Sequence, residues 1–194
     1  MVHPFAGFYE AQHRGKGSVW LSCVFMALYG VACCIEQQYK GFIVNSAHIS
    51  KINSLTTFIS SITIFLLFCV ANWTITTLFD GKGKLKDIFM VTSYSLVPVI
   101  IVKLIITFVS NYIISEEAAI INAVVALSWV WFAFLMMAGL CTIHEYSVAK
   151  NLVTLLCTVI AAAIIIFIVV LFISLIEQVV SFLSTFFKEL ARRI

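Results

Sequence analysis

Long apolar stretches alternate with short polar segments along the whole chain. A helix that crosses the hydrocarbon core of a bilayer needs about 20 mainly apolar residues. Five stretches meet this requirement, and they run approximately over residues 18–35, 55–79, 88–113, 118–143 and 152–176. The pattern therefore predicts an all-α fold, a polytopic transmembrane helical bundle with five spans.

After residue 176 the pattern changes, because polar and apolar residues alternate in a helical rhythm over 177–194. This amphipathic tail either continues the last span or lies along the membrane surface. No internal repeat or proline-rich linker interrupts the chain, so residues 1–194 are predicted to form a single membrane domain. Pro98 lies inside the third predicted span, where a kink is tolerated if neighbouring helices satisfy the freed carbonyl.

The composition excludes a soluble protein. Hydrophobic residues make up 62% of the 194 residues and charged residues 11%, whereas soluble domains average about a quarter charged residues. A chain of this length has too little interior to enclose so much apolar surface. A water-soluble enzyme and a nucleic-acid-binding domain are therefore excluded, and the chain is expected to be an integral membrane protein.

The six cysteines fall within apolar stretches, and their spacing does not match a zinc knuckle. They are expected to be small buried apolar residues, although Cys33 and Cys34 lie close enough to the aqueous phase for a disulfide.

The first apolar run has an alternative interpretation as a secretory signal, because Arg14 and Lys16 precede it. A retained first span is favoured, because no small-residue cleavage pattern follows the run.

Lysine and arginine resist translocation, so their distribution over the loops predicts the orientation. With a cytoplasmic amino terminus, six of these residues lie on the cytoplasmic side and two lie in the opposite loops. The six are Arg14, Lys16, Lys82, Lys84, Lys86 and Lys150, and the two are Lys40 and Lys51. Five crossings then place the carboxyl terminus outside. The tail then adds three basic residues to the outer side, so the count of basic residues becomes six inside against five outside. The three are Lys188, Arg192 and Arg193.

Two segments at the predicted cytoplasmic boundary combine glycine with basic residues, and they run from Arg14 to Ser18 and from Gly81 to Asp87. Glycine lets backbone N–H groups approach an anion and lysine adds charge, so a phosphate or anionic-headgroup site is one interpretation. The favoured interpretation is that these basic residues set the orientation. Neither segment fits a nucleotide-binding P-loop, because Gly15-Lys16 lacks a glycine five positions earlier.

His144 and Glu145 close the fourth predicted span. A zinc protease would need a second histidine four positions after His144, and Val148 occupies that position. We therefore predict no metal site and no cofactor. Three acidic residues could still join this pair in a polar cluster at a solvated membrane rim, namely Glu10, Asp80 and Asp87.

Lys103 lies about 15 Å from the nearer end of the third predicted span, where a charge is costly. Three polar residues share its helix face and form a polar stripe with it, namely Thr92, Thr107 and Ser110. This stripe should face other helices. Lys103 could contact an ion or substrate, but snorkelling to the outer headgroups or bonding to a neighbouring carbonyl is favoured. No acidic counter-charge is evident for Lys103 in the same membrane layer.

A similar polar face on the second span is expected to hydrogen-bond across helices, and it consists of Ser61, Asn72 and Thr76.

The stretch from Asn72 to Phe89, NWTITTLFDGKGKLKDIF, resembles a hallmark of the Yip-domain family, five-span membrane proteins named for their interaction with Rab/Ypt GTPases. Three further stretches agree with it, namely His3-Pro4-Phe5 with Gly7 to Glu10, Arg14 to Ser18, and Ile143 to Ser147. The resemblance covers nearly the whole chain and is to the short bacterial branch, which lacks the long cytosolic amino-terminal region of eukaryotic members. It implies a cell-membrane protein with no established reaction. Members of this branch accompany carbohydrate transporters of the ATP-binding-cassette class.

These segments share the cytoplasmic side of the predicted topology, so they predict a docking or headgroup face. Its candidate residues are Glu10, Arg14, Lys16, Asp80, Lys82, Lys84, Lys86, Asp87, His144 and Glu145. The first hypothesis is a non-catalytic adaptor or accessory subunit of a larger membrane complex, with a carbohydrate transporter as one candidate. Its expected partners are the bilayer with anionic headgroups and other membrane proteins, and no nucleic acid. The alternative is a small solute or ion transporter or channel that uses the stripe around Lys103. An intramembrane enzyme ranks third, because no nucleophile has a base at helical spacing.

Overall fold

The computed structural model describes residues 4–13, 17–44 and 53–193, except for the side chains of residues 13, 187, 190, 191 and 193. All regular secondary structure in these residues is helical. Five of the described helical segments are long and apolar enough to cross a membrane. The predicted all-α, five-span class is therefore confirmed.

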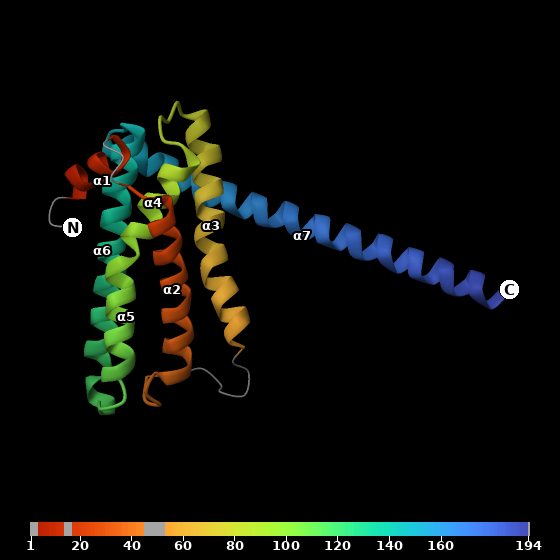
Figure 1. Cartoon of the computed structure of the whole chain (residues 1–194), viewed down its shortest axis with the longest axis horizontal. Helices are drawn as coiled ribbons and strands as arrows, with labels where there is room; N and C mark the ends of the chain where they lie inside the picture. Colours follow the sequence, from red (N-terminus) through yellow and green to blue (C-terminus); the bar gives the residue numbers. More distant parts are fainter. Residues whose placement is uncertain (1–3, 14–16, 45–52, 194) are drawn as a thin grey trace.

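Eight helical elements follow one another along the described residues. They are α1 Pro4–His13, α2 Val19–Tyr39, α3 Ser54–Leu78, α4 Leu85–Ser95, α5 Val97–Val109, the 3-10 helix η2 Ser115–Glu117, α6 Ala118–His144 and α7 Val148–Arg193. Helices α2, α3, α5 and α6 lie side by side, and α1 and α4 gather at one end of this bundle (Figure 1). The short helix α1 was not predicted.

Polar caps set the beginnings of α2 and α3. The Ser18 hydroxyl accepts a hydrogen bond from the Leu21 N–H at 3.4 Å, and the Asn53 side chain accepts one from the Leu55 N–H at 3.1 Å. Such caps satisfy N–H groups that have no partner inside the helix. At its other end α2 continues to Tyr39, four residues past the predicted boundary at 35, and so Glu36 is part of the helix.

The third span is one crossing made of two helices, because α4 ends at Ser95 and α5 begins at Val97. Pro98 stands in the first turn of α5, where its missing N–H costs no hydrogen bond inside that helix. The kink expected at Pro98 is therefore a break between helices. The helical part runs from Leu85 to Val109, three residues earlier at its start than predicted, and Ser110 caps its end.

Two apolar clusters fill the bundle. The larger one packs α2, α3, α5 and α6 together, and its buried members are Met26, Tyr29, Ala32, Phe65, Leu96, Val99, Ile100 and Phe132. The second lies nearer to α1 and consists of Phe8, Cys69, Ile88, Val91, Leu140 and Ile143. Phe8 therefore ties the amino-terminal helix to the membrane bundle. All six cysteines are free thiols, including Cys33 and Cys34.

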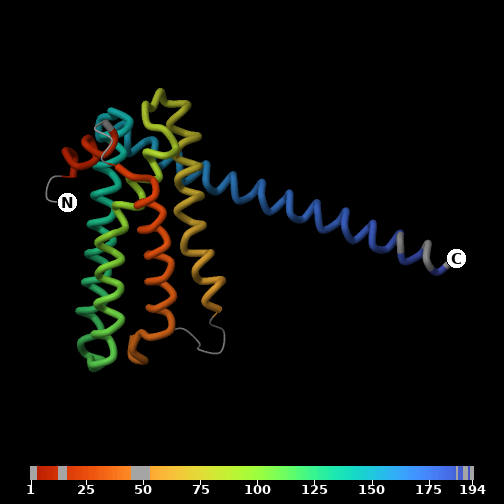
Figure 2. The backbone as a smooth tube through the Cα atoms, viewed as in Figure 1, coloured from red at the N-terminus to blue at the C-terminus, as the bar shows by residue number. Residues whose placement is uncertain are grey.

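The last helix, α7, packs only its first turns against the bundle. Asn72 of α3 donates a hydrogen bond to the Thr158 hydroxyl at 3.1 Å, as expected for a polar residue that bonds across helices. After passing α3, which it borders as far as Ile166, α7 leaves the bundle and runs far from it to the carboxyl end (Figures 1 and 2). The tail predicted over 177–194 continues this helix through Arg193 and is not a separate element.

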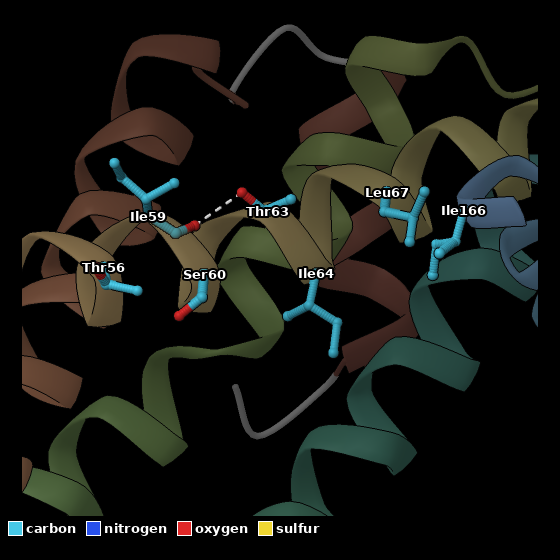
Figure 3. A pocket seen from close by; sticks show the side chains of 7 residues that line it. All are labelled: Thr56, Ile59, Ser60, Thr63, Ile64, Leu67 and Ile166. Carbon is cyan, nitrogen blue, oxygen red and sulfur yellow. Dashed lines mark hydrogen bonds between the residues drawn. The ribbon is translucent and has the colours of Figure 1, made fainter. Parts of the chain in front are cut away.

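A shallow groove borders α3 where α7 passes it. Its walls are Thr56, Ile59, Ser60, Thr63, Ile64 and Leu67 of α3, with Ile166 of α7 (Figure 3). The hydroxyls of Ser60 and Thr63 donate to carbonyls of their own helix, at 3.2 and 2.8 Å. These polar groups are therefore satisfied within α3.

Candidate functional site

Three segments that are far apart in the sequence meet at one end of the bundle. They are α1, the loop 79–84 and the turn 145–147, and we call this region the motif end (Figure 1). Gln12 of α1 donates to the Ile143 carbonyl at 3.3 Å, and the Gly83 N–H donates to His144 Nδ1 at 3.3 Å. The stretches that resemble the Yip-domain family therefore form one structural unit wherever they are described.

Helix α1 fits closely against α6 and α4. Phe8 is buried, and a Cβ atom added at Gly139 of α6 would lie 2.4 Å from Val91 Cγ1 and 3.2 Å from Phe8. A similar close approach occurs where the chain leaves α1, since a Cβ at Gly17 would lie 2.9 Å from the Met90 sulfur. These two glycines let three helices meet at the motif end without a gap.

The helices α3 and α6 both end with a left-handed residue that is not glycine. Asp80 has φ 58° and Glu145 has φ 54°. After each of them the next N–H bonds back to the last turn, from Gly81 to Thr76 at 2.8 Å and from Tyr146 to Cys141 at 3.0 Å. This is the usual way to end a helix, but glycine normally occupies the left-handed position because a side chain there costs about 1 kcal/mol or more. The chain thus keeps a carboxylate at two strained positions of the motif end.

His144 is buried beneath the glycine loop and holds that loop in place. Its side chain is 1% exposed, and a Cβ at Gly81 or Gly83 would come within 2.5 or 2.8 Å of the ring. Because Nδ1 accepts from the Gly83 N–H, the neutral ring carries its proton on Nε2. Nε2 is buried and has no hydrogen-bond partner among the described residues. His144 therefore fixes the loop from inside.

Tyr146 holds the loop from a second side. Its hydroxyl donates to the Phe79 carbonyl at 2.8 Å, and its ring stacks on His144 with centroids 5.3 Å apart. Lys150 Nζ lies 4.3 Å from the centre of the Tyr146 ring, within the range of a cation–π contact. Burial, with a smaller contribution from Asp80, raises the Tyr146 pKa, so the hydroxyl stays protonated and remains a donor at neutral pH.

His144 and Tyr146 together support a set of charged side chains, and we call this set the charged face. Its members are exposed, and they are Asp80, Lys82, Lys84, Lys86, Glu145 and Lys150. Lys82 and Glu145 form an ion pair at 2.5 Å between the loop and the end of α6, and both side chains are more than half exposed. Such a pair contributes little stability, about 0 to 1 kcal/mol, but it orders two flexible side chains.

Some residues predicted for the docking face have other positions. Asp87 is 6% exposed and accepts from the Lys84 N–H at 3.0 Å, so it caps α4, and His144 is buried as described above. Both residues position the charged face and do not form it. Glu10 is partly exposed on α1, whereas Arg14 and Lys16 lie outside the described residues. Among the described side chains, no three His, Cys, Asp or Glu residues are placed to share a metal ion.

The interpretation of Lys103 needs correction, because this residue has an acidic partner. Lys103 forms an ion pair with Glu36 of α2, which also bonds to Lys40 at 3.2 Å. The charge of Lys103 is therefore balanced by a carboxylate of the neighbouring helix, and the expectation that it has no acidic counter-charge was wrong. Glu36 was missed because the first span was predicted to end at residue 35.

The rest of the polar stripe lies in helix contacts, as predicted. Thr92 and Thr107 are fully buried, and Ser110 is 2% exposed. The Ser110 hydroxyl accepts from the Gly41 N–H at 2.8 Å and so joins the end of α5 to the end of α2. A solute path along this stripe would have to open these contacts and separate Lys103 from Glu36.

These features define a polytopic α-helical membrane protein with a structured polar end. A family model for the Yip1 domain matches residues 1–172 of the 194. The chain therefore belongs to the Yip1-domain family, and the resemblance found in its sequence is confirmed. Searches of curated proteins and of solved structures find no match to the chain.

Proposed function

We propose that this chain is a non-catalytic membrane adaptor, an accessory subunit that holds a partner on its charged face. The observation that carries the proposal is the pair of left-handed carboxylate residues, Asp80 and Glu145, at the edges of the buried His144 and Tyr146 support. Glycine would be easier for the backbone at both positions. Keeping charged side chains there favours a role for the face that they form.

The support beneath the face suits docking. The loop that carries Lys82 and Lys84 is bonded to His144 and Tyr146, so its charges have a defined arrangement before a partner arrives. Pre-organisation of this kind lowers the entropy that binding must overcome. Exposed charges of both signs favour a partner with a complementary polar surface, and they would set its orientation and its rate of association.

The proposed setting is the cell membrane with the amino terminus and the charged face in the cytoplasm, and with the carboxyl terminus outside. Lys82 and Lys84 of the loop and Lys86 in the first turn of α4 support this orientation, because basic segments beside a span remain on the cytoplasmic side. The proposed partner is another integral membrane protein, with subunits of a carbohydrate transporter as the first candidates to examine.

Site-specific photo-crosslinking tests the adaptor role. A photoreactive residue at position 84 should give an adduct of defined mass in intact membranes, whereas the same residue at Glu116, at the opposite end of the bundle, should not. With the probe kept at position 84, replacing Lys82 and Lys86 together with Gln should abolish the adduct while the purified chain keeps its helical content. Equal crosslinking from positions 84 and 116, or an adduct that survives the double replacement, would contradict a specific charged docking face. Solute flux through vesicles that contain the purified chain alone would favour the transporter alternative.

A further inference from the structure

A second groove lies between α3 and the beginning of α4, and it differs from the one in Figure 3 by having a cation at its rim. Its walls are Leu66, Cys69, Val70, Leu85, Lys86 and Phe89. The groove has a volume of about 430 Å³, which falls within the range of about 300 to 1,000 Å³ typical of ligand pockets.

The walls are apolar and open to the outside of the bundle. Leu66, Val70 and Leu85 are 45, 44 and 39% exposed, on helices that are long and apolar enough to cross the membrane. The Cys69 thiol at the back of the groove is 2% exposed and lies 3.5 Å from the Thr92 hydroxyl, so its polar atom is already used. The body of the groove therefore suits a hydrocarbon chain.

The polarity changes along the groove towards the motif end. Leu66, Val70 and Trp73 follow one another at spacings of four and three residues, so they share one face of α3. Trp73 is 45% exposed and lies about 4.5 Å beyond Val70 along the helix axis. Tryptophan concentrates where the hydrocarbon core meets the headgroups. The mouth of the groove is thus at headgroup level, and Lys86 lies there.

Lys86 has no acidic partner among the described ion pairs. The nearest carboxylate in sequence, Asp87, is buried and bonded to the Lys84 N–H, while Glu145 is paired with Lys82. The mouth therefore carries net positive charge above an apolar cavity. This arrangement matches a molecule with an anionic head and a hydrocarbon tail.

We infer that the groove between α3 and α4 binds one anionic phospholipid. Its acyl chain would lie against Leu66, Val70 and Phe89, and its phosphate would meet the Lys86 ammonium. The groove in Figure 3 has no cation in its wall, so it offers acyl contacts without a headgroup anchor. This inference does not depend on the adaptor role, because Lys86 alone belongs both to the wall of the groove and to the charged face.

Native mass spectrometry of the full chain tests the inference, with delipidated protein titrated with phosphatidylglycerol or with phosphatidylcholine of the same acyl chains. One phosphatidylglycerol should bind more tightly than phosphatidylcholine. Lys86→Gln should weaken it about fivefold, the change that corresponds to about 1 kcal/mol for one cation near a charged surface. Lys150→Gln, which removes another exposed lysine of the motif end, should leave the affinity unchanged. Val70→Trp should fill the groove and weaken both lipids, whereas Val130→Trp on the exposed side of α6 should not.

The inference is overturned if Lys86→Gln and Lys150→Gln weaken phosphatidylglycerol equally, because the attraction is then unspecific. It is also overturned if a folded Val70→Trp variant binds phosphatidylglycerol like the unmodified chain, because the lipid then lies elsewhere. Loss of lipid binding in Lys86→Gln with photo-crosslinking from position 84 intact would leave the adaptor proposal standing. Phosphatidylglycerol binding that depends on Lys86, in a chain that gives no specific adduct from position 84, would remove the adaptor role and keep the lipid site.

Discussion

The ion pair between Lys103 and Glu36 allows a quantitative test of how α2 and α5 are held together. Lys103 is 12% and Glu36 18% exposed at the side chain, and the two residues are 67 positions apart in the sequence. Breaking a buried ion pair by removing one partner costs about 3 to 5 kcal/mol, because the remaining charge is left uncompensated. Removing Lys103 should cost less than removing Glu36, because Glu36 also bonds to Lys40.

We expect Lys103→Met to lower the free energy of unfolding by about 1 to 2 kcal/mol, because Glu36 keeps Lys40 as a partner. Glu36→Met should cost more, about 2 to 4 kcal/mol, because it leaves Lys103 without a described acidic partner. The double replacement should be less harmful than the sum of the single ones, with a coupling of about 1 to 2 kcal/mol. Lys40→Met is the matched control, and loss of its pair within one helix should cost only about 0.3 to 0.5 kcal/mol.

Reversible unfolding by sodium dodecyl sulfate in mixed micelles, followed by far-ultraviolet circular dichroism, measures all four variants. A coupling below about 0.3 kcal/mol would show that the two residues act independently and would refute the assigned pair. So would a Lys103→Met protein as stable as the unmodified chain, the result that snorkelling of Lys103 predicts.

Three further predictions concern the motif end. In a background without the native cysteines, Lys82→Cys should react with an impermeant maleimide only after the cells are permeabilised, while Glu116→Cys should react in intact cells; the reverse pattern would invert the proposed orientation. Gly83→Ala should cost about 1 to 3 kcal/mol, because its Cβ would lie 2.8 Å from the His144 ring, whereas Gly7→Ala, with open space around it, should be neutral or stabilising by up to about 1 kcal/mol; equal effects would contradict the tight packing of the loop. Tyr146→Phe should cost about 1 kcal/mol at neutral pH, and because burial raises the Tyr146 pKa, the difference from the unmodified chain should persist to about pH 10 and disappear as the pH rises through the native pKa; a difference that vanishes at pH 8 in an unfolding titration would contradict this assignment.

The crossings of the membrane were predictable because each one depends on a local property. An apolar run of about 20 residues favours the bilayer whatever its neighbours do, so composition and spacing suffice to count the spans and to exclude soluble classes. The family was also visible in local strings, from Asn72 to Phe89 and from Ile143 to Ser147, because these polar segments are short and continuous. A face shared by Lys103 and Thr107 could be predicted for the same reason, because helical periodicity relates residues on one element.

The partners of these residues depended on contacts between separate elements, which periodicity on one helix does not contain. The sequence could not pair Lys103 with Glu36, because that contact requires the crossing of α2 and α5 and the extension of α2 past residue 35. It also could not bury Asp87 and His144, since both are polar residues at helix ends and only packing against the loop removes them from the surface. The left-handed backbone at Glu145 gave no signal, because glycine is the usual marker of that conformation. The free energy of inserting an apolar segment into the bilayer is a sum over the residues of that segment. The charged face instead depends on how several segments pack together, and only the tertiary structure decides this packing.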